Sequence, residues 1–197
     1  MRSDYKHWRN SQELGATLFI TSTCLDFAHL FRRDEMREFL AKHLLQQRLD
    51  LGARLHAFVV MTHHFHTISS APEDRTCSWL VQKIKKSASE QMVELLTTAE
   101  KALVSQQLGL NERQFWMRSF RGIPIKDERM MENTSIYIHW NPIRSGFCEQ
   151  PTAYRWSSAW LFERDLYDLD QGLKLSDCLS AFSDPPHWRS ADVEGCV

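Results

Sequence analysis

The stretch from Ala53 to Ser70 constrains the fold of this chain more than any other part of its sequence. It reads ARLHAFVVMTHHFHTISS, which is too rich in β-branched and aromatic residues for a helix. A polar break near Thr62 allows the chain to double back. We therefore expect two antiparallel strands here, joined by a turn.

The flanking segments alternate between strand-like and helix-like patterns: strands at 16–24 and 115–125, helices at 31–49 and 78–100. Asp34 is the expected N-cap of the first helix. A third helix begins at Asp127 and should end at Pro142, because proline cannot continue a helix. The order β, α, β, β, α, β, α predicts an α+β fold, with a ferredoxin-like core, a mostly antiparallel sheet of about five strands, and helices on one face of that sheet.

Charge neither requires nor excludes a nucleic-acid partner. The chain has 197 residues, a size that fits one domain, and a net charge of −1. Residues 163–197 hold eight acids and three bases, which leaves +4 on the first 162 residues. A phosphate-binding protein usually has an excess of Lys and Arg. A mildly basic body with an acidic tail is compatible with DNA binding.

Cysteines and apolar runs argue against other classes. The five cysteines are scattered and never spaced as Cys-x-x-Cys, so we expect reduced, mostly buried thiols rather than disulfides or a zinc ribbon. No apolar run reaches the roughly 18 residues needed to span a bilayer. The N-terminal MRSDYKHWRNSQELG has no apolar core of a signal peptide. We expect a cytoplasmic protein that does not bind membranes.

Two histidines of the hairpin are the first candidate functional residues. On a strand, His64 and His66 project from the same face, and His63 points to the other. Such a pair either seats a divalent metal or is a half-buried, hydrogen-bonded structural pair. Histidine-triad hydrolases would need a third His at position 68, which is Ile68, and the repeated His-x-Thr or His-x-Ser of two-histidine phosphoesterases does not recur. The remaining match is the His-hydrophobic-His (HUH) pattern of single-strand DNA endonucleases, which also require a tyrosine nucleophile.

The last predicted helix supplies a tyrosine. In SIYIHWNP, Tyr137 and Asn141 are four residues apart and share a helix face. A phenol and an amide carbonyl placed in this way can approach a metal held by His64 and His66. Tyr137 could equally be a core aromatic residue, and Asn141 a helix-terminal residue before proline.

Beyond these residues, the chain resembles REP-associated tyrosine transposases, a branch of the single-tyrosine HUH transposases. The similar segments are GATLFITSTCLDFAHLF, AFVVMTHHFH where the family typically has AYVVMPNHVH, and WMRSFRGIPIKDE. The most specific segment is YIHWNPIRSGFCEQPTAYRWSSAW, which is close to the family's YIxxNPVRxGLV followed by YxWSS. The resemblance runs from about residue 14 to residue 161.

The resemblance implies a site, a cofactor and a reaction. His64 and His66, on a central strand, and Asn141 would bind Mg²⁺ or Mn²⁺, and Tyr137 would be the nucleophile. The ion would act as Lewis acid and template for the scissile phosphate. Attack by Tyr137 would leave a 5′-phosphotyrosine link and a free 3′-hydroxyl. Thr62 and His63 stand where the family has Pro-Asn, so we interpret His63 as a structural residue that faces away from the site.

Three groups of residues are the expected DNA contacts, through charge or base stacking. They are Arg2, Tyr5, Lys6, Trp8 and Arg9 in the N-terminal arm, Lys83, Lys85 and Lys86 on the second helix, and Arg118 and Arg121 before the last helix. The lysines could equally form an ordinary solvated face. Trp140 and Trp156 are expected in the core.

These interpretations divide the chain into a basic and aromatic arm (1–13), a transposase-like domain (14–162) and an acidic extension (163–197). The predicted protein is a metal-dependent endonuclease and strand transferase that acts on single-stranded or hairpin DNA, as a monomer or homodimer. The main alternative is a catalytically inactive, domesticated protein that binds hairpin DNA. A metal-dependent small-molecule phosphoesterase is a third interpretation.

Overall fold

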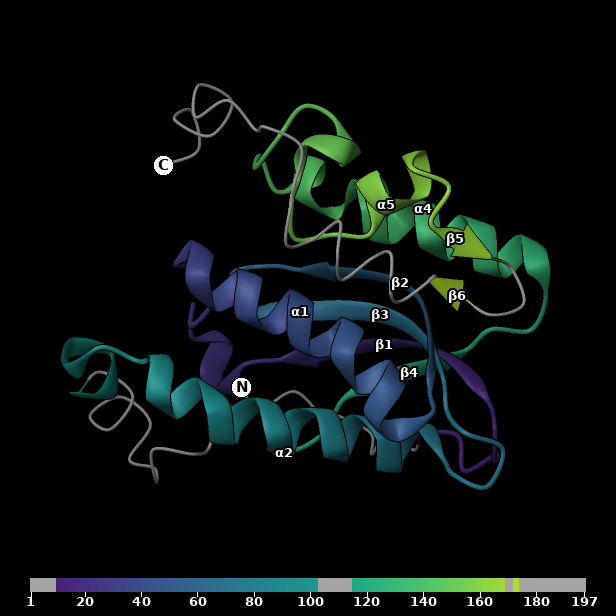
Figure 1. The fold of residues 1–197 in the computed structure, drawn as a ribbon, viewed down its shortest axis with the longest axis horizontal. Coiled ribbons are helices and arrows are strands. Elements are labelled where there is room, and N and C mark those ends of the chain that lie inside the picture. Colours follow the sequence, from purple (N-terminus) through teal and green to yellow (C-terminus); the bar gives the residue numbers. More distant parts are fainter. Residues whose placement is uncertain (1–9, 103–114, 169–171, 174–197) are drawn as a thin grey trace, which may run out of the picture.

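The computed structural model describes residues 10–102, 115–168 and 172–173 (Figure 1). Its strands are β1 (Thr17–Thr23), β2 (Arg54–Val60), β3 (His64–Ser70), β4 (Arg121–Pro124), β5 (Tyr167–Asp168) and β6 (Gly172–Leu173). Its helices are α1 (Asp34–Leu51), α2 (Cys77–Leu95), α4 (Glu128–Arg144) and α5 (Ala159–Glu163), with short 3-10 turns η1 (Leu25–Phe27) and η2 (Pro151–Ala153).

Strands β1 to β4 form one antiparallel sheet in the order β2-β3-β1-β4. The predicted hairpin is present as β2 and β3, and β3, which begins at His64, is a central strand as expected. Within the described residues the sheet has four strands instead of about five, because β5 and β6 pair only with each other. The α+β prediction with a ferredoxin-like order is confirmed.

The helices cover both faces of the sheet, so the prediction of one helical face is wrong (Figure 1). Leu18 and Ile20 of β1 share an apolar cluster with Cys77 and Val81 of α2. Phe19 points to the opposite face, where its ring packs against Tyr137 of α4. The ferredoxin-like core has two helices, α1 and α2. Helix α4 is a third long helix, and it forms a second helical layer over β2 and β3.

Two predicted helix ends differ from the observed ends. Asp34 is not the N-cap of α1: the helix starts at Asp34, and Arg33 precedes it in an extended conformation. α2 ends at Leu95 instead of reaching residue 100, because Thr97 and Glu100 close a capping box that starts a new helical turn. The Thr97 N–H donates to Glu100 Oε2 (2.8 Å), and the Glu100 N–H donates to Thr97 Oγ1 (3.2 Å).

Helix α4 continues through Pro142 and ends at Arg144, two residues beyond the predicted end. A proline in the last turn removes only one hydrogen bond, and the turn is closed by bonds that do not involve its nitrogen. The Ser145 N–H donates to the Asn141 carbonyl (3.1 Å), and the Gly146 N–H donates to the Ile143 carbonyl (2.9 Å). Gly146 has a φ of +75°, a conformation that favours glycine.

The predicted strand at 115–125 is interrupted. Trp116 forms an isolated antiparallel bridge with Cys24 beyond the end of β1, and the continuous strand covers only Arg121–Pro124. Residues 1–9 of the predicted arm lie outside the described residues. Asn10 is attached to the outer edge of β4: its side chain donates to the Phe120 carbonyl (3.1 Å) and accepts from the Gly122 N–H (2.9 Å).

The described residues beyond Phe162 pack on the domain. Leu173 of β6 is fully buried. Gly172 has a φ of +77°, and a Cβ there would lie 2.5 Å from the Leu55 carbonyl oxygen. Residues 174–197, most of the predicted acidic extension, lie outside the described part of the chain.

Cys24, Cys77 and Cys148 are free thiols, as expected, and Cys178 and Cys196 are not among the described residues. Within the described ranges, no helix combines the length and the apolar character needed to cross a membrane.

Candidate functional site

His64 and His66 lie side by side at the start of β3, with ring centroids 4.7 Å apart. Antiparallel pairing sets Thr23 opposite His64 and Thr21 opposite His66, so these four side chains share one face of the sheet. The Thr21 hydroxyl is 2.9 Å from His66 Nδ1. This hydrogen bond fixes the ring and leaves Nε2 of His66 for another partner.

Both imidazoles are neutral at physiological pH. Burial lowers the pKa of His64 to about 4, with a further contribution from His63. Burial also lowers the pKa of His66 to about 3, with smaller contributions from His64 and His63. A neutral imidazole keeps a lone pair on one nitrogen, and this is the form that binds a metal ion.

The tyrosine of α4 lies against this pair. The Tyr137 ring centroid is 5.8 Å from that of His66 and 5.8 Å from that of Phe19. Tyr137 is 40% exposed, so its side chain is accessible from outside the protein. The structure therefore brings three residues that were selected from the sequence, His64, His66 and Tyr137, into one place.

Asn141 lies one turn further along α4 and is buried with Ile138 on the side that faces the sheet. The helix is anchored near this point by Ser158, which belongs to the YRWSS segment. Ser158 Oγ is 2.8 Å from His139 Nε2 and accepts the Phe58 N–H of β2 at 2.9 Å. The YRWSS segment thus holds the helix against the hairpin that carries the histidines.

Arg144 is a site residue that the sequence reasoning missed. Its guanidinium carbon is 5.0 Å from the centroid of the Tyr137 ring. The spacing i, i+7 places both residues on one helix stripe, and this was the available signal. The guanidinium brings positive charge beside the tyrosine, where an incoming phosphate would also need it.

The residues present fit a divalent metal. His64 Nδ1 is buried and has no hydrogen-bond partner among the described residues, which is costly unless another group binds the ring. Within the same residues, no group of three His, Cys, Asp or Glu side chains is arranged to hold a metal. A third protein ligand would therefore have to be of another type, and the amide oxygen of Asn141 is the predicted one.

The prediction that His63 lies on a strand and faces away from the site is wrong, because β3 begins one residue later, at His64. Its ring centroid is 4.5 Å from that of His64 and 5.0 Å from that of His29. His29 Nδ1 is in turn 2.8 Å from the Thr62 hydroxyl. A row of imidazoles therefore extends from the pair toward η1, a part of the site that the sequence did not indicate.

The predicted DNA-binding residues differ in their exposure. Arg121 is exposed on β4 and lies opposite Thr21 in the sheet register, on the face that carries the histidines. Arg118 is exposed in the preceding loop, and Lys83 and Lys86 are exposed on α2. Lys85 turns inward and donates to the Met117 carbonyl at 2.7 Å, and burial lowers its pKa to about 8. Arg2, Tyr5, Lys6, Trp8 and Arg9 lie outside the described residues.

The two tryptophans expected in the core differ. Trp156 is buried and its ring carries the guanidinium of Arg37 at 3.9 Å. Trp140 is 45% exposed on α4, so its assignment to the core was wrong. Adjacent apolar positions in YIHWNP do not reveal which one faces away from the sheet.

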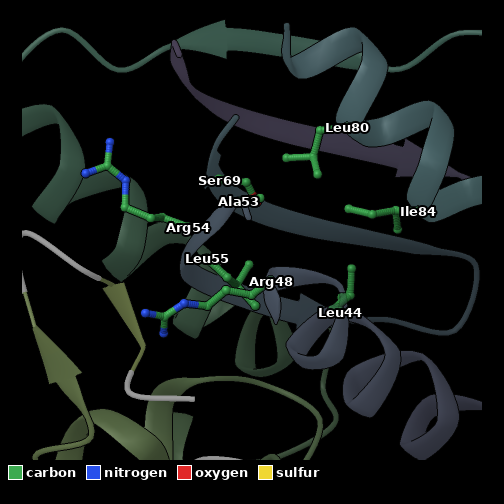
Figure 2. A pocket seen from close by; sticks show the side chains of 8 residues that line it. All are labelled: Leu44, Arg48, Ala53, Arg54, Leu55, Ser69, Leu80 and Ile84. Carbon is green, nitrogen blue, oxygen red and sulfur yellow. The ribbon is translucent and has the colours of Figure 1, made fainter. Parts of the chain in front are cut away.

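A small hollow lies elsewhere, between α1, α2 and the far end of the hairpin (Figure 2). It is lined by Leu44, Arg48, Ala53, Arg54, Leu55, Ser69, Leu80 and Ile84. Its cavity volume is about 10 Å³, far below the roughly 300 Å³ at which small-molecule sites begin. Arg54 pairs with Ser70 at the opposite end of the hairpin from His64. The hollow is therefore separate from the histidine site, and its size does not favour a second ligand site.

A central strand with paired histidines, covered by a helix that bears an exposed tyrosine, is the layout of a single-tyrosine transposase. A family model described as IS200-like transposase matches residues 24–141. This match covers more than half of the chain, and the chain belongs to the IS200-like transposase family.

One solved structure supports this fold. The chain is similar to a REP-associated tyrosine transposase solved with a bound REP hairpin, with 22% identity and a TM-score of 0.61 over 84% of this chain and 90% of that chain. It is also similar to a proposed transposase from Deinococcus radiodurans, with 16% identity and a TM-score of 0.44 over 66% of this chain and 95% of that chain. A comparison with curated proteins gives no match.

Proposed function

We propose that this chain is a metal-dependent single-stranded DNA endonuclease and strand transferase that acts at hairpin or palindromic repeats. The observation that carries the proposal is the position of Tyr137, 5.8 Å between ring centroids from His66, within the same chain as the neutral histidine pair. Membership of the IS200-like transposase family supports it. So does the similar fold of a tyrosine transposase that was solved with a REP hairpin.

In this proposal His64, His66 and Asn141 would hold Mg²⁺ or Mn²⁺, and the bound ion would supply Lewis-acid chemistry for the scissile phosphate. The Tyr137 oxygen attacks the phosphorus in line, and the bond to the 3′ oxygen breaks. The leaving 3′ oxygen takes up a proton to give a 3′-hydroxyl, and Tyr137 keeps the 5′-phosphate. The free energy of the phosphodiester is retained in this link, so a second DNA 3′-hydroxyl can reverse the step on a new partner.

The chain's own residues assist in two ways. Thr21 holds the ring of His66 through its 2.9 Å hydrogen bond, which fixes the direction of the ligand nitrogen. Arg144, 5.0 Å from the centroid of the Tyr137 ring, supplies positive charge for the phosphate oxygens at the tyrosine.

The direct test is a covalent adduct between the protein and an end-labelled hairpin oligonucleotide in the presence of Mn²⁺. We expect the wild type to form an adduct that survives denaturing electrophoresis and Tyr137→Phe to form none. Tyr167→Phe is the matched control and should form the adduct as the wild type does. His64→Ala and His66→Ala should lose the adduct and still bind the hairpin, because the metal serves the chemical step.

Tight hairpin binding without an adduct would instead favour the inactive binding protein. Nucleotide hydrolysis that survives Tyr137→Phe would favour a small-molecule phosphoesterase.

A further inference from the structure

Helix α4 carries an unusual concentration of exposed apolar side chains. Ile136, Tyr137 and Trp140 are 48%, 40% and 45% exposed. The other large exposed apolar residues among those described lie on other segments, at Leu14, Phe27, Leu49 and Leu95. The exposure of Trp140 is notable because an indole buries more apolar surface than most side chains, and nothing in the fold of the described residues uses it.

The helix geometry places Trp140 beside the tyrosine. Residues three and four apart are neighbours on a helix surface, so Trp140 lies next to Tyr137 and Arg144 lies next to Trp140. Asn141 and Ile138 are buried toward the sheet, on the other side of Tyr137. Trp140 therefore forms the outer flank of the tyrosine, and Arg144 reaches back over the Tyr137 ring. We call Tyr137, Trp140 and Arg144 the α4 patch.

The size and charge of the α4 patch indicate which kind of ligand it can bind. A stable protein interface buries about 800 Å² on each side, which three side chains on one helix cannot provide. One flat aromatic face next to one guanidinium matches a single nucleotide, which has a base that stacks and a phosphate that accepts hydrogen bonds. Arg121 adds positive charge on the same face of the sheet.

We propose that Trp140 stacks on an unpaired base beside the scissile phosphate and thereby positions that phosphate at Tyr137. This inference rests on the proposed function and adds a positioning residue to it. It requires the base next to the cleavage point to lie outside a duplex, since a base inside a duplex is stacked between its neighbours on both faces.

The test measures the affinity of the protein for two hairpins, one with an unpaired flank and one without. We expect Trp140→Ala to weaken binding of the flanked hairpin about 5- to 150-fold, the range measured for one base stacked on an aromatic residue. Binding of the hairpin without a flank should not change. Trp140→Phe should restore most of the loss, because it keeps an aromatic face. Ile136→Ala, the control on the same helix, removes apolar surface without an aromatic face and should have little effect.

A single abasic residue, moved stepwise along the flank, identifies the stacked base. At one position the abasic oligonucleotide should weaken wild-type binding as much as Trp140→Ala does, and should cause no further loss in Trp140→Ala. Equal losses on both hairpins, or losses that add at every flank position, would overturn the inference. So would unchanged DNA affinity together with a change of oligomeric state, which would assign the patch to a contact between two copies.

Failure of the proposed function gives a different result. If the wild type forms no adduct but binds the flanked hairpin through Trp140, the stacking role stands without catalysis. If the wild type binds neither hairpin, both proposals are wrong.

Discussion

At the scale of single residues, the hydroxyl of Thr21 orients one of the two histidines of the site. Thr21 is the hydrogen-bond partner of His66 Nδ1, and the hydroxyl hydrogen bond decides which ring nitrogen carries the proton. If His66 donates from Nδ1, its Nε2 lone pair is directed away from β1 and toward the site. The register that pairs Thr21 with His66 would therefore help to set the geometry of the proposed metal site.

Thr21→Val keeps the shape of the side chain and removes this partner. We expect a 10- to 100-fold loss in Mn²⁺ affinity, the range typical for loss of the group that orients a metal-binding histidine. The measurement is the dependence of the melting temperature on Mn²⁺ concentration, which needs no catalytic activity.

Thr17→Val is the matched control, since Thr17 lies on the same face of β1 and its hydroxyl is 2.6 Å from Ser70 Oγ. It should leave the Mn²⁺ dependence unchanged. If the two variants behave alike, the hydroxyl of Thr21 has no role in orienting His66.

At the scale of secondary structure, α2 separates three lysines that look alike in the sequence. Lys83 and Lys86 are exposed, whereas the ammonium group of Lys85 is bonded to the Met117 carbonyl. We expect Lys83→Ala and Lys86→Ala each to weaken hairpin binding and to lower the slope of log affinity against log salt by about one, if each lysine contacts a phosphate.

Lys85→Met should behave in the opposite way. It should leave the salt slope unchanged and lower the free energy of unfolding by about 1 to 3 kcal/mol, because the Met117 carbonyl loses its charged hydrogen-bond donor. Urea unfolding and a salt titration of binding distinguish the two roles. A lower salt slope in Lys85→Met would show that Lys85 also contacts DNA.

The elements that were predicted well are those with a strong local pattern. The hairpin at Ala53–Ser70 was found because its residue types exclude a helix. The end of α2 was missed because the Thr97 and Glu100 box lies inside a stretch that is otherwise compatible with a helix. The exposure of Trp140 depends on which side of α4 meets the sheet, and YIHWNP has apolar residues on both sides.

At the scale of the whole molecule, buried neutral histidines should make stability depend on pH. Burial, with smaller contributions from Arg54 and Arg48, lowers the pKa of His56 to about 4, and burial lowers that of His139 to about 4. In the unfolded chain each titrates near 6.5. Between these values the unfolded state binds more protons than the native state, so the free energy of unfolding falls as pH drops from about 6.5 to about 4.

Each such histidine contributes a slope of up to about 1.4 kcal/mol per pH unit within that window. His56→Gln should reduce this slope by up to that amount. Above pH 7, the free energy of unfolding should depend on pH in the same way in the variant and in the wild type. Urea unfolding at several pH values, with a chelator present, measures this. An unchanged slope would mean that His56 is not held neutral by the fold.

The order of strands and helices along the chain could be predicted from the sequence. The helical layer on the second face of the sheet could not. Strand and helix order is a local property, and it yields the sheet order through standard connections. The covering of the second face by α4 arises from long-range contacts, such as the bond of Ser158 to β2 and its contact with His139. The pairing of Tyr137 with the histidines could be predicted only because a family resemblance related two segments far apart in the chain.

The packing of α4 on β2 and β3 of its own chain has a consequence for stoichiometry. A molecule whose tyrosine and histidines belong to one polypeptide can hold one DNA end at a time, so each chain should accumulate no more than one labelled 5′ end. Mixtures of His64→Ala and Tyr137→Phe should then stay inactive, because the intact tyrosine of one chain cannot combine with the intact histidine pair of the other. Recovery of adduct formation in the mixture would show that the helix is exchanged between chains. If the mixture stays inactive, moving a DNA segment with two ends requires either two molecules working together or one molecule acting twice.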